Sequence, residues 1–223
     1  MTRPHAKTIL VTGGTGLLGK GLEETLPPGW RIVSVHQRDY AVEGSPSRHL
    51  VLDIRDKRAV DQLFAENAFD AVVHAAGIAS VDYVEKHFAE SLESNIVGTL
   101  NVTSAARRAG THLIYISTNA VFDGKKAPYR EDDPVAPVNK YGGLKVECER
   151  LVRETLEHWT IVRPILMYGW NHSVTAATEN APRDLRSRQA ELRRSAAAKR
   201  GGPARRPVRG RGTCRAGDAG FPR

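Results

Sequence analysis

Three side chains in the middle of the chain have the types and spacing for proton transfer coupled to hydride transfer. Tyr141 and Lys145 stand four residues apart, and on a helix that separation places both on one face. A lysine ammonium beside a phenol stabilises the phenolate and lowers the tyrosine pKa, so the phenol can act near neutral pH. Thr118 ends a strand-like run and could hydrogen-bond a substrate oxygen. Together they predict chemistry at a carbinol or carbonyl carbon.

A glycine-rich turn near the start of the chain has the pattern that binds cofactor phosphates. In TGGTGLLG, Gly13, Gly16 and Gly19 follow a strand-like run and open a helical one. Gly13 would allow the tight turn, Gly16 the approach of a pyrophosphate, and Gly19 the close packing of helix on strand. The phosphates would lie at the helix N-terminus. The predicted contacts are Gly13, Thr15, Gly16, Leu17, Leu18 and Gly19.

The ends of the next strands are expected to select the nicotinamide cofactor. An acidic residue after the second strand would favour NAD, whereas this chain has His36-Gln37-Arg38-Asp39. Arg38 could bind a 2′-phosphate through paired hydrogen bonds, so NADP is favoured and NAD remains an alternative; a second alternative leaves Arg38 as solvated surface. Asp53, followed by Ile54, is placed for the adenine edge or, alternatively, caps the next helix.

A run of small residues ends the fourth strand-like segment. The sequence HAAG includes Ala75, Ala76 and Gly77, and small side chains at a carboxyl strand end let the backbone pass close to a ligand. Tight packing alone would leave the same pattern. We therefore count these three residues as candidate cofactor contacts.

The elements that must position these residues alternate between strand and helix. Apolar, β-branched runs predict strands at residues 8–12, 31–36, 49–53, 71–74, 112–117 and 160–163. Helical patterns predict helices at 17–26, 57–66, 84–109 and 141–158, with Asp56 as an N-cap and Gly110 as a C-cap. Alternation of this kind predicts an α/β fold with a doubly wound parallel sheet of the Rossmann type.

Composition divides the chain of 223 residues into two parts. Residues 1–170 hold 20 Lys and Arg against 21 Asp and Glu, a net charge of −1, while residues 171–223 hold 13 against 4, a net charge of +9. The second part therefore holds all of the excess positive charge. Of these last 53 residues, 32 are Ala, Arg, Gly or Pro, so they bury too little to order themselves. We expect a Rossmann domain over 1–170 and a basic, mostly disordered tail over 171–223, with a short helix at 184–199 as an option.

Three interpretations of the basic tail stay open. It is an arm for nucleic acid or a membrane surface, a solvated extension without a role, or the product of a shifted reading frame, because its four commonest residues all have GC-rich codons. The third is favoured, so nucleic acid is the least favoured partner. Two cysteines, Cys148 and Cys214, give no disulfide framework or zinc cluster. No signal peptide or spanning segment is evident, and we expect a cytoplasmic protein without a metal.

Residues 6–170 resemble an extended short-chain dehydrogenase/reductase, and within that superfamily the dTDP-4-dehydrorhamnose reductase group. The resemblance is carried by TGGTGLLG, HAAG, the block STNAVFDGKKAPYREDDPVAPVNKYGGLKVECE at 117–149 and RPILMYG at 163–169. It implies that Thr118, Tyr141 and Lys145 are catalytic, with Tyr141 as proton donor. It also implies a nucleotide-sugar substrate with a 4-keto group, a homodimer or a partner enzyme, and a loop near the substrate shaped by 122–124 and 129–131.

Two departures from the group bear on the substrate and the activity. Where the group has an Asp-Tyr pair after the strand-end threonine, this chain has Asn119-Ala120, so Thr118 and Asn119 are the expected substrate contacts and the rhamnose precursor is in question. The group also continues into a C-terminal lobe over the sugar nucleotide, which the tail does not resemble. A truncated or frame-shifted, weakly active chain is therefore expected. The same group includes the NADP-binding regulatory β subunit of methionine adenosyltransferase, which gives a non-catalytic alternative.

Overall fold

The computed structural model describes residues 6–39 and 45–167. They all lie in the first of two compact units, Met1–Asn180, whereas the second unit, Ala181–Arg223, lies outside the described residues. The predictions of a missing lobe, a disordered tail, a helix at 184–199 and a shifted frame also concern residues outside the described part. Within the described residues, no helix is long and apolar enough to cross a membrane.

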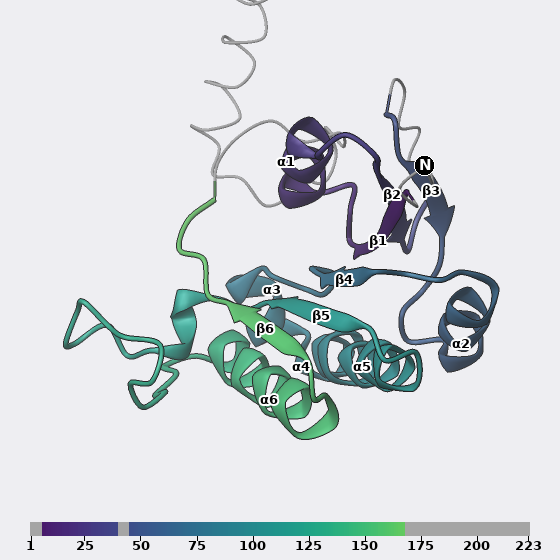
Figure 1. Cartoon of the computed structure of the whole chain (residues 1–223). Coiled ribbons are helices and arrows are strands. Elements are labelled where there is room, and N and C mark those ends of the chain that lie inside the picture. Colours follow the sequence, from purple (N-terminus) through teal and green to yellow (C-terminus); the bar gives the residue numbers. More distant parts are fainter. Residues whose placement is uncertain (1–5, 40–44, 168–223) are drawn as a thin grey trace, which may run out of the picture. The chain divides into compact units, whose positions relative to one another are not determined.

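A parallel sheet forms the centre of the first unit (Figure 1). Its strands are β1 Lys7–Thr12, β2 Trp30–His36, β3 Arg48–Val51, β4 Ala71–His74, β5 His112–Ile116 and β6 Trp159–Val162. They lie in the order β3-β2-β1-β4-β5-β6, and every pair is parallel. The order reverses between β1 and β4, and the crevice at the carboxyl ends of such a pair is where open α/β sheets bind ligands.

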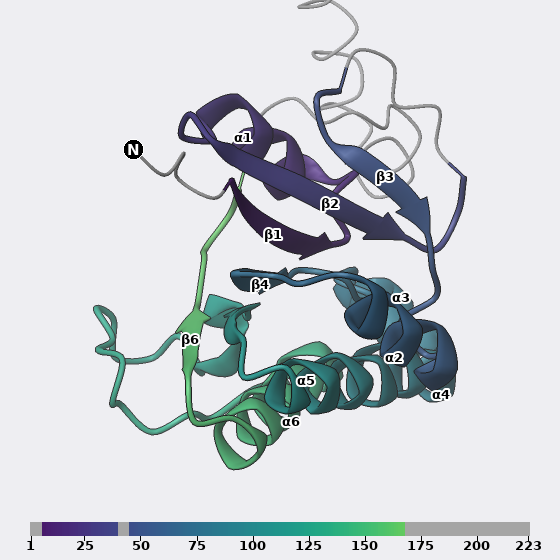
Figure 2. The ribbon, with the colours of Figure 1, turned by 45° about the vertical axis from the view of Figure 1, so that its right-hand side comes forward.

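Helices cover both faces of this sheet. They are α1 Leu17–Thr25, α2 Lys57–Glu66, α3 Val81–Lys86, α4 Phe88–Leu92, a π-helical turn Glu93–Val97, α5 Gly98–Arg108, a 3-10 turn Asn119–Val121 and α6 Lys140–Thr155. Figure 2 shows α1 on one face and α2, α5 and α6 on the other. The predicted doubly wound Rossmann fold is confirmed.

Alternate residues of each strand pack against opposite layers. Leu10 of β1 belongs to the core with α5 and α6, whereas Val11 belongs to the core with α1. Both side chains are almost fully buried. Strands buried on both faces read as continuous apolar runs, which explains why the central strands β1, β2 and β4 could be located from the sequence.

The single predicted helix over 84–109 is wrong. His87 has φ −127° and ψ 52°, outside the helical region, and separates α3 from α4. A π-helical turn then joins α4 to α5, where the side chain of Asn95 is drawn inward. The predicted end of this segment is confirmed: Gly110 has φ 63°, its N–H donates to Arg107 O, and the next N–H donates to Ala106 O. This pattern is a Schellman cap.

Candidate active site

The glycine-rich loop after β1 has the backbone geometry of a phosphate-binding turn. Gly13 has φ 73°, and its N–H donates to Val35 O over 2.8 Å. A Cβ at Gly13 would lie 3.0 Å from the backbone of Ala76, so the loop and the HAAG segment are in direct contact. Gly13 therefore adopts a positive φ and also allows the backbone of Ala76 to approach closely, as its predicted role in a tight turn requires.

The start of α1 is open to an anion. Gly16 is the N-cap residue, no side chain caps the helix, and its first turn, which includes Leu17 and Leu18, has no acidic residue. A Cβ at Gly19 would stand 1.9 Å from Gly14 O, so only glycine allows the helix to pack this closely on the loop. Uncapped N–H groups and the positive end of the helix dipole suit a pyrophosphate, so these residues fit a dinucleotide cofactor.

The predicted adenine-end residues come together at the ends of β2 and β3. Gln37 donates to the Asp53 carboxylate over 3.0 Å, and the Arg38 side chain beside it is exposed. The Arg55 guanidinium holds Asp53 with several hydrogen bonds and lowers the pKa of that carboxyl. The helix-cap alternative for Asp53 is wrong, because Asp56 accepts the first N–H groups of α2, as predicted. Ile54 is buried against Gly98.

The HAAG segment is held by a buried polar network. The His74 ring contacts the Thr12 hydroxyl through Nδ1 at 2.7 Å and the Thr99 hydroxyl through Nε2 at 3.0 Å. Thr12 Oγ1 also accepts the Ala76 N–H at 3.1 Å. Ala75 and Ala76 therefore sit at the carboxyl end of β4 with their backbone fixed against β1. The burial of His74 is complete.

Burial, together with the Lys145 charge, lowers the pKa of His74 to about 3. Below its unfolded pKa of about 6.5 the unfolded chain gains a proton that the folded chain does not bind, so acid destabilises the fold. We expect wild type to lose about 2 kcal/mol more of its unfolding free energy than His74→Gln between about pH 7.5 and about pH 5. Urea denaturation at both pH values measures this difference. A pH slope in His74→Gln equal to that of wild type would contradict the prediction.

Asn95 is a site residue that the sequence did not reveal. Its side-chain oxygen accepts the Ile78 N–H at 2.7 Å, and its amide nitrogen donates to Ile78 O at 3.1 Å. A Cβ at Gly77, which has φ 143°, would lie 2.4 Å from the same amide oxygen. Asn95 therefore fixes the turn after β4. The signal in the sequence was the polar Asn95 side chain between Leu92 and Ile96, within an otherwise apolar helical run.

Thr118, Tyr141 and Lys145 meet at the carboxyl end of β5. The N-terminus of α6 is fixed by Asn139, whose side chain accepts the Gly142 N–H at 2.7 Å. Tyr141 and Lys145 are then one helical turn apart, and both are buried. Thr118, in extended conformation, lies close enough to the Tyr141 phenol for its hydroxyl to influence the pKa of that phenol. The structure thus brings the three predicted catalytic residues together.

The protonation of Tyr141 differs from the sequence-based prediction. Burial raises the pKa of Tyr141, and the group that opposes this is the Thr118 hydroxyl rather than the Lys145 ammonium. The Lys145 ammonium instead donates to Ile116 O at 2.9 Å and lies 4.9 Å from the centre of the Tyr115 ring. The prediction of a lowered tyrosine pKa is therefore wrong for this structure. Tyr141 carries its proton at neutral pH, as a proton donor must.

Lys145 is a buried ammonium group whose pKa is lower than that of an exposed lysine. Its burial lowers the pKa to about 8, while the nearby Glu149 carboxylate opposes that shift. Cys148 is itself buried, with Sγ 3.4 Å from Asn95 O. The ammonium therefore sits among polar groups of β5, α6 and the π-helical turn.

Asn119 begins the 3-10 turn that follows Thr118. Its side chain is exposed, and its N–H donates to Pro164 O at 3.0 Å, which ties the turn to the segment after β6. A Cβ at Gly142 would lie 2.3 Å from Ala120 O, so the start of α6 packs directly on this turn. Asn119 is thus next to the predicted catalytic residues and accessible from solvent, as its predicted role as a substrate contact requires.

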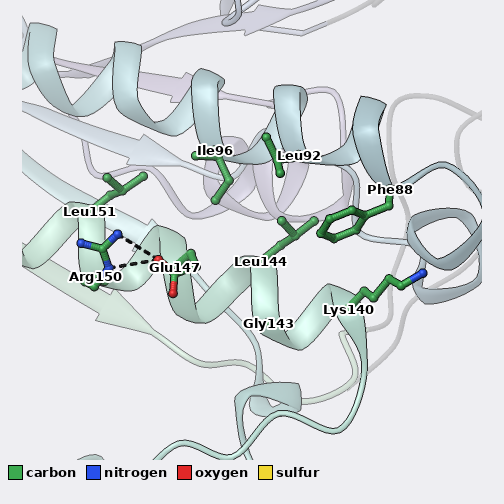
Figure 3. Close-up of a pocket in the computed structure, with 9 residues that line it drawn as sticks. All are labelled: Phe88, Leu92, Ile96, Lys140, Gly143, Leu144, Glu147, Arg150 and Leu151. Carbon is green, nitrogen blue, oxygen red and sulfur yellow. Dashed lines mark hydrogen bonds and ion pairs between the residues drawn. The ribbon is translucent and has the colours of Figure 1, made fainter.

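A pocket of about 480 Å³ lies between α6 and the segment formed by α4 and the π-helical turn (Figure 3). Its lining residues are Phe88, Leu92, Ile96, Lys140, Gly143, Leu144, Glu147, Arg150 and Leu151. None of the three predicted catalytic residues is among them. Across residues 6–39 and 45–167, no three His, Cys, Asp or Glu side chains gather as a metal site.

A Rossmann sheet with a phosphate loop at β1 and a Thr-Tyr-Lys group at β5 and α6 defines an extended short-chain dehydrogenase/reductase. The family model described as the RmlD substrate binding domain matches residues 7–207, a range that extends past the described part of the chain. The chain therefore belongs to the RmlD substrate binding domain family. The resemblance found in the sequence is confirmed.

Curated relatives include proteins with different roles. Methionine adenosyltransferase 2 subunit beta of Xenopus laevis is 32% identical over 165 residues, which are 74% of this chain and 48% of that protein. The spore coat polysaccharide biosynthesis protein SpsK of Bacillus subtilis is 34% identical over 163 residues, 72% of this chain and 53% of that protein. The chain thus spans about half the length of the curated relatives it matches.

Solved structures of nucleotide-sugar enzymes share the fold. The dTDP-4-dehydrorhamnose reductase of Bacillus anthracis in complex with NADP has a TM-score of 0.65 and 31% identity, covering 76% of this chain and 58% of that one. The UDP-glucose 4-epimerase of Bifidobacterium longum in complex with NAD⁺ and UDP has a TM-score of 0.63 and 30% identity, covering 73% and 53%. Both of these similar structures hold a nicotinamide cofactor, NADP in one and NAD⁺ in the other.

Proposed function

We propose that this chain is the cofactor-binding and catalytic part of an NADP-dependent reductase of a 4-keto sugar nucleotide. The observation that carries the proposal is the meeting of Thr118, Tyr141 and Lys145 at the carboxyl end of β5. The phosphate loop lies at the carboxyl end of β1 in the same parallel sheet. The match to a reductase that binds NADP supports the same reaction.

The residues divide the chemistry between binding, orientation and proton transfer. A bound nicotinamide would supply the hydride. Tyr141, kept protonated by burial, would give its proton to the oxygen of the reduced carbonyl, while the Thr118 hydroxyl orients that oxygen. Lys145, buried below them, would hold the nicotinamide ribose and favour the phenolate that remains after the transfer.

The predicted substrate contacts favour a 4-keto sugar nucleotide other than the rhamnose precursor, or a range of substrates wider than that precursor alone. The exposed Asn119 provides an amide where a carboxylate is usual in the group, and Ala120 provides no ring. The full chain should be tested by NADPH oxidation with dTDP-4-dehydrorhamnose and with other nucleotide 4-keto sugars. NADPH binding without any turnover would reject the reductase proposal and favour the second candidate.

Arg38 supports NADP as the preferred cofactor. The exposed guanidinium at the end of β2 could bind the 2′-phosphate in a bidentate manner. We expect Arg38→Ala to raise the Kd for NADPH by about 10- to 100-fold, the value of a hydrogen bond to a charged group, and to leave the Kd for NADH within about twofold. Fluorescence titration of both cofactors measures the change. Arg31→Ala, at the exposed start of the same strand, is the control, and an equal loss for both cofactors would contradict the assignment.

A regulatory subunit is the second candidate function. It is favoured by the 32% identity to methionine adenosyltransferase 2 subunit beta. That candidate requires NADP binding, a stable complex with a partner enzyme and no turnover, and co-purification of the full chain with the host's methionine adenosyltransferase tests it. Either role is compatible with a cytoplasmic location, which the free buried thiol of Cys148 supports.

A further inference from the structure

Glu149 is a buried carboxylate for which the proposed reaction has no use. Its side chain is only 1% exposed, and its two oxygens accept four hydrogen bonds. Ser117 donates from Oγ at 2.6 Å, Arg163 from Nε at 2.9 Å and Nη2 at 2.7 Å, and Arg153 from Nη2 at 3.1 Å. Burial alone would raise the pKa of Glu149, but the hydrogen bonds from Arg163 and Ser117 lower it. The group is therefore a carboxylate at neutral pH.

Arg163 joins this carboxylate to the loop at residues 122–131. Its Nη1 donates to Glu131 O at 3.1 Å, at the end of the loop. Its guanidinium lies 5.0 Å from the centre of the Phe122 ring, at the start of the loop. Phe122 in turn stacks on Tyr129 with ring centres 4.3 Å apart and planes 9° apart. One side chain thus contacts both ends of the loop, which is otherwise largely exposed.

The same carboxylate also contacts the elements that carry the catalytic residues. Ser117 directly precedes Thr118, and Glu149 stands one helical turn after Lys145 on α6. The pair therefore connects β5, α6, the segment after β6 and the 122–131 loop. A buried ion pair is weak evidence for stability, because the loss of solvation offsets its attraction. The role of this ion pair therefore follows from the elements that it connects rather than from its contribution to stability.

We propose that Arg163 is a positioning residue that holds the 122–131 loop against the catalytic helix, with Glu149 as its anchor. The loop starts four residues after Thr118, so its position sets one wall of the space beside the Tyr141 phenol. A fixed wall orients the sugar ring for reaction, and small displacements there are costly. This inference rests on the proposed function for its effect on turnover, but the attachment of the loop can be tested independently.

Arg163→Lys is the first variant, because lysine keeps the charge but cannot form the fork that contacts Glu149 and Glu131 together. The loop contains three trypsin sites, Lys125, Lys126 and Arg130, all exposed. We expect cleavage at these sites to be about 10-fold faster than in wild type, since cleavage follows the population of the open loop. Mass spectrometry of the fragments that end at these residues gives the rate.

Arg153→Ala is the matched control. Arg153 also pairs with Glu149, at 3.1 Å, but it is exposed and its other recorded partner is the Trp159 ring, not the loop. We expect its loop cleavage and its turnover to match those of wild type. Equal loop cleavage in Arg163→Lys and Arg153→Ala would overturn the proposal, since loss of an ion pair to Glu149 would then be the whole effect.

Phe122→Leu tests the loop without altering the buried ion pair. It removes the ring between Arg163 and Tyr129, and we expect about 10-fold faster cleavage in the loop here as well. If Arg163→Lys does not fold, the test rests on Phe122→Leu. Unchanged loop cleavage in Phe122→Leu would overturn the proposal.

Turnover separates this inference from the proposed function. In Arg163→Lys we expect the KM for the keto sugar nucleotide to rise about 10-fold with a smaller change in kcat, and the Kd for NADPH to stay within about twofold. An open loop with unchanged KM would overturn the orienting role. Absence of turnover in wild type would reject the reductase, and the cleavage rates would still decide the attachment of the loop.

Discussion

Replacing Tyr141 with phenylalanine should lower the kcat for carbonyl reduction by about 10²- to 10⁴-fold, the usual contribution of a positioned general acid. The phenol is buried and protonated at neutral pH, and it lies beside the Thr118 hydroxyl. Phenylalanine keeps the ring that packs with Val84 and Leu144 and removes only the acidic group. NADPH oxidation under saturating substrate measures the loss.

The same variant should bind NADPH with a Kd within about twofold of the wild-type value, because the phosphate loop lies on another strand. Tyr83→Phe is the control: the Tyr83 hydroxyl bonds Glu90 at 2.7 Å on the exposed helices α3 and α4, so turnover should be unchanged. A Tyr141→Phe enzyme that keeps half of its kcat would show that another group donates the proton.

Gly19→Ala should weaken binding of the nicotinamide cofactor by about 100-fold, the cost of moving binding groups by roughly an ångström. The added methyl group would stand 1.9 Å from Gly14 O, a backbone atom that cannot rotate away. Either α1 or the loop must shift, and the uncapped N–H groups at Gly16 move with it. Overpacking of this kind also costs about 1–3 kcal/mol of stability.

Gly21→Ala is the matched control in the same helix. A Cβ there meets nothing within 4 Å, and alanine favours a helix over glycine by about 1 kcal/mol. We therefore expect a slightly more stable protein with unchanged cofactor affinity. Fluorescence titration with NADPH and thermal unfolding of both variants test the contrast. Equal affinities in Gly19→Ala and Gly21→Ala would show that α1 need not approach the loop closely.

The sequence alone was sufficient to predict the sheet and the three side chains that meet at the carboxyl end of β5. The central strands β1, β2 and β4 are largely buried, so their apolar runs stand out from the exposed segments between them. The edge strands β3 and β6 are only partly buried, and their β-branched and apolar residues were enough to locate them. The glycines at 13, 16 and 19 and the Tyr141–Lys145 spacing depend on local backbone geometry, which a short stretch of sequence encodes. Asp56 and Gly110 were predicted as caps for the same reason.

Contacts between distant segments were decided only by the tertiary structure. The break at His87 and the π-helical turn accompany the hydrogen bond between the Asn95 side chain and the Ile78 backbone. No local sequence pattern predicts that contact. The direction of the shift in the Tyr141 pKa depends on burial and on the position of the Lys145 ammonium, which donates to Ile116 O. Glu149 and Arg163 are fourteen residues apart, and their pairing arises only when β6 is placed beside β5. Local spacing thus encodes turns and helix faces, whereas burial and long-range charge pairing exist only after the sheet has assembled.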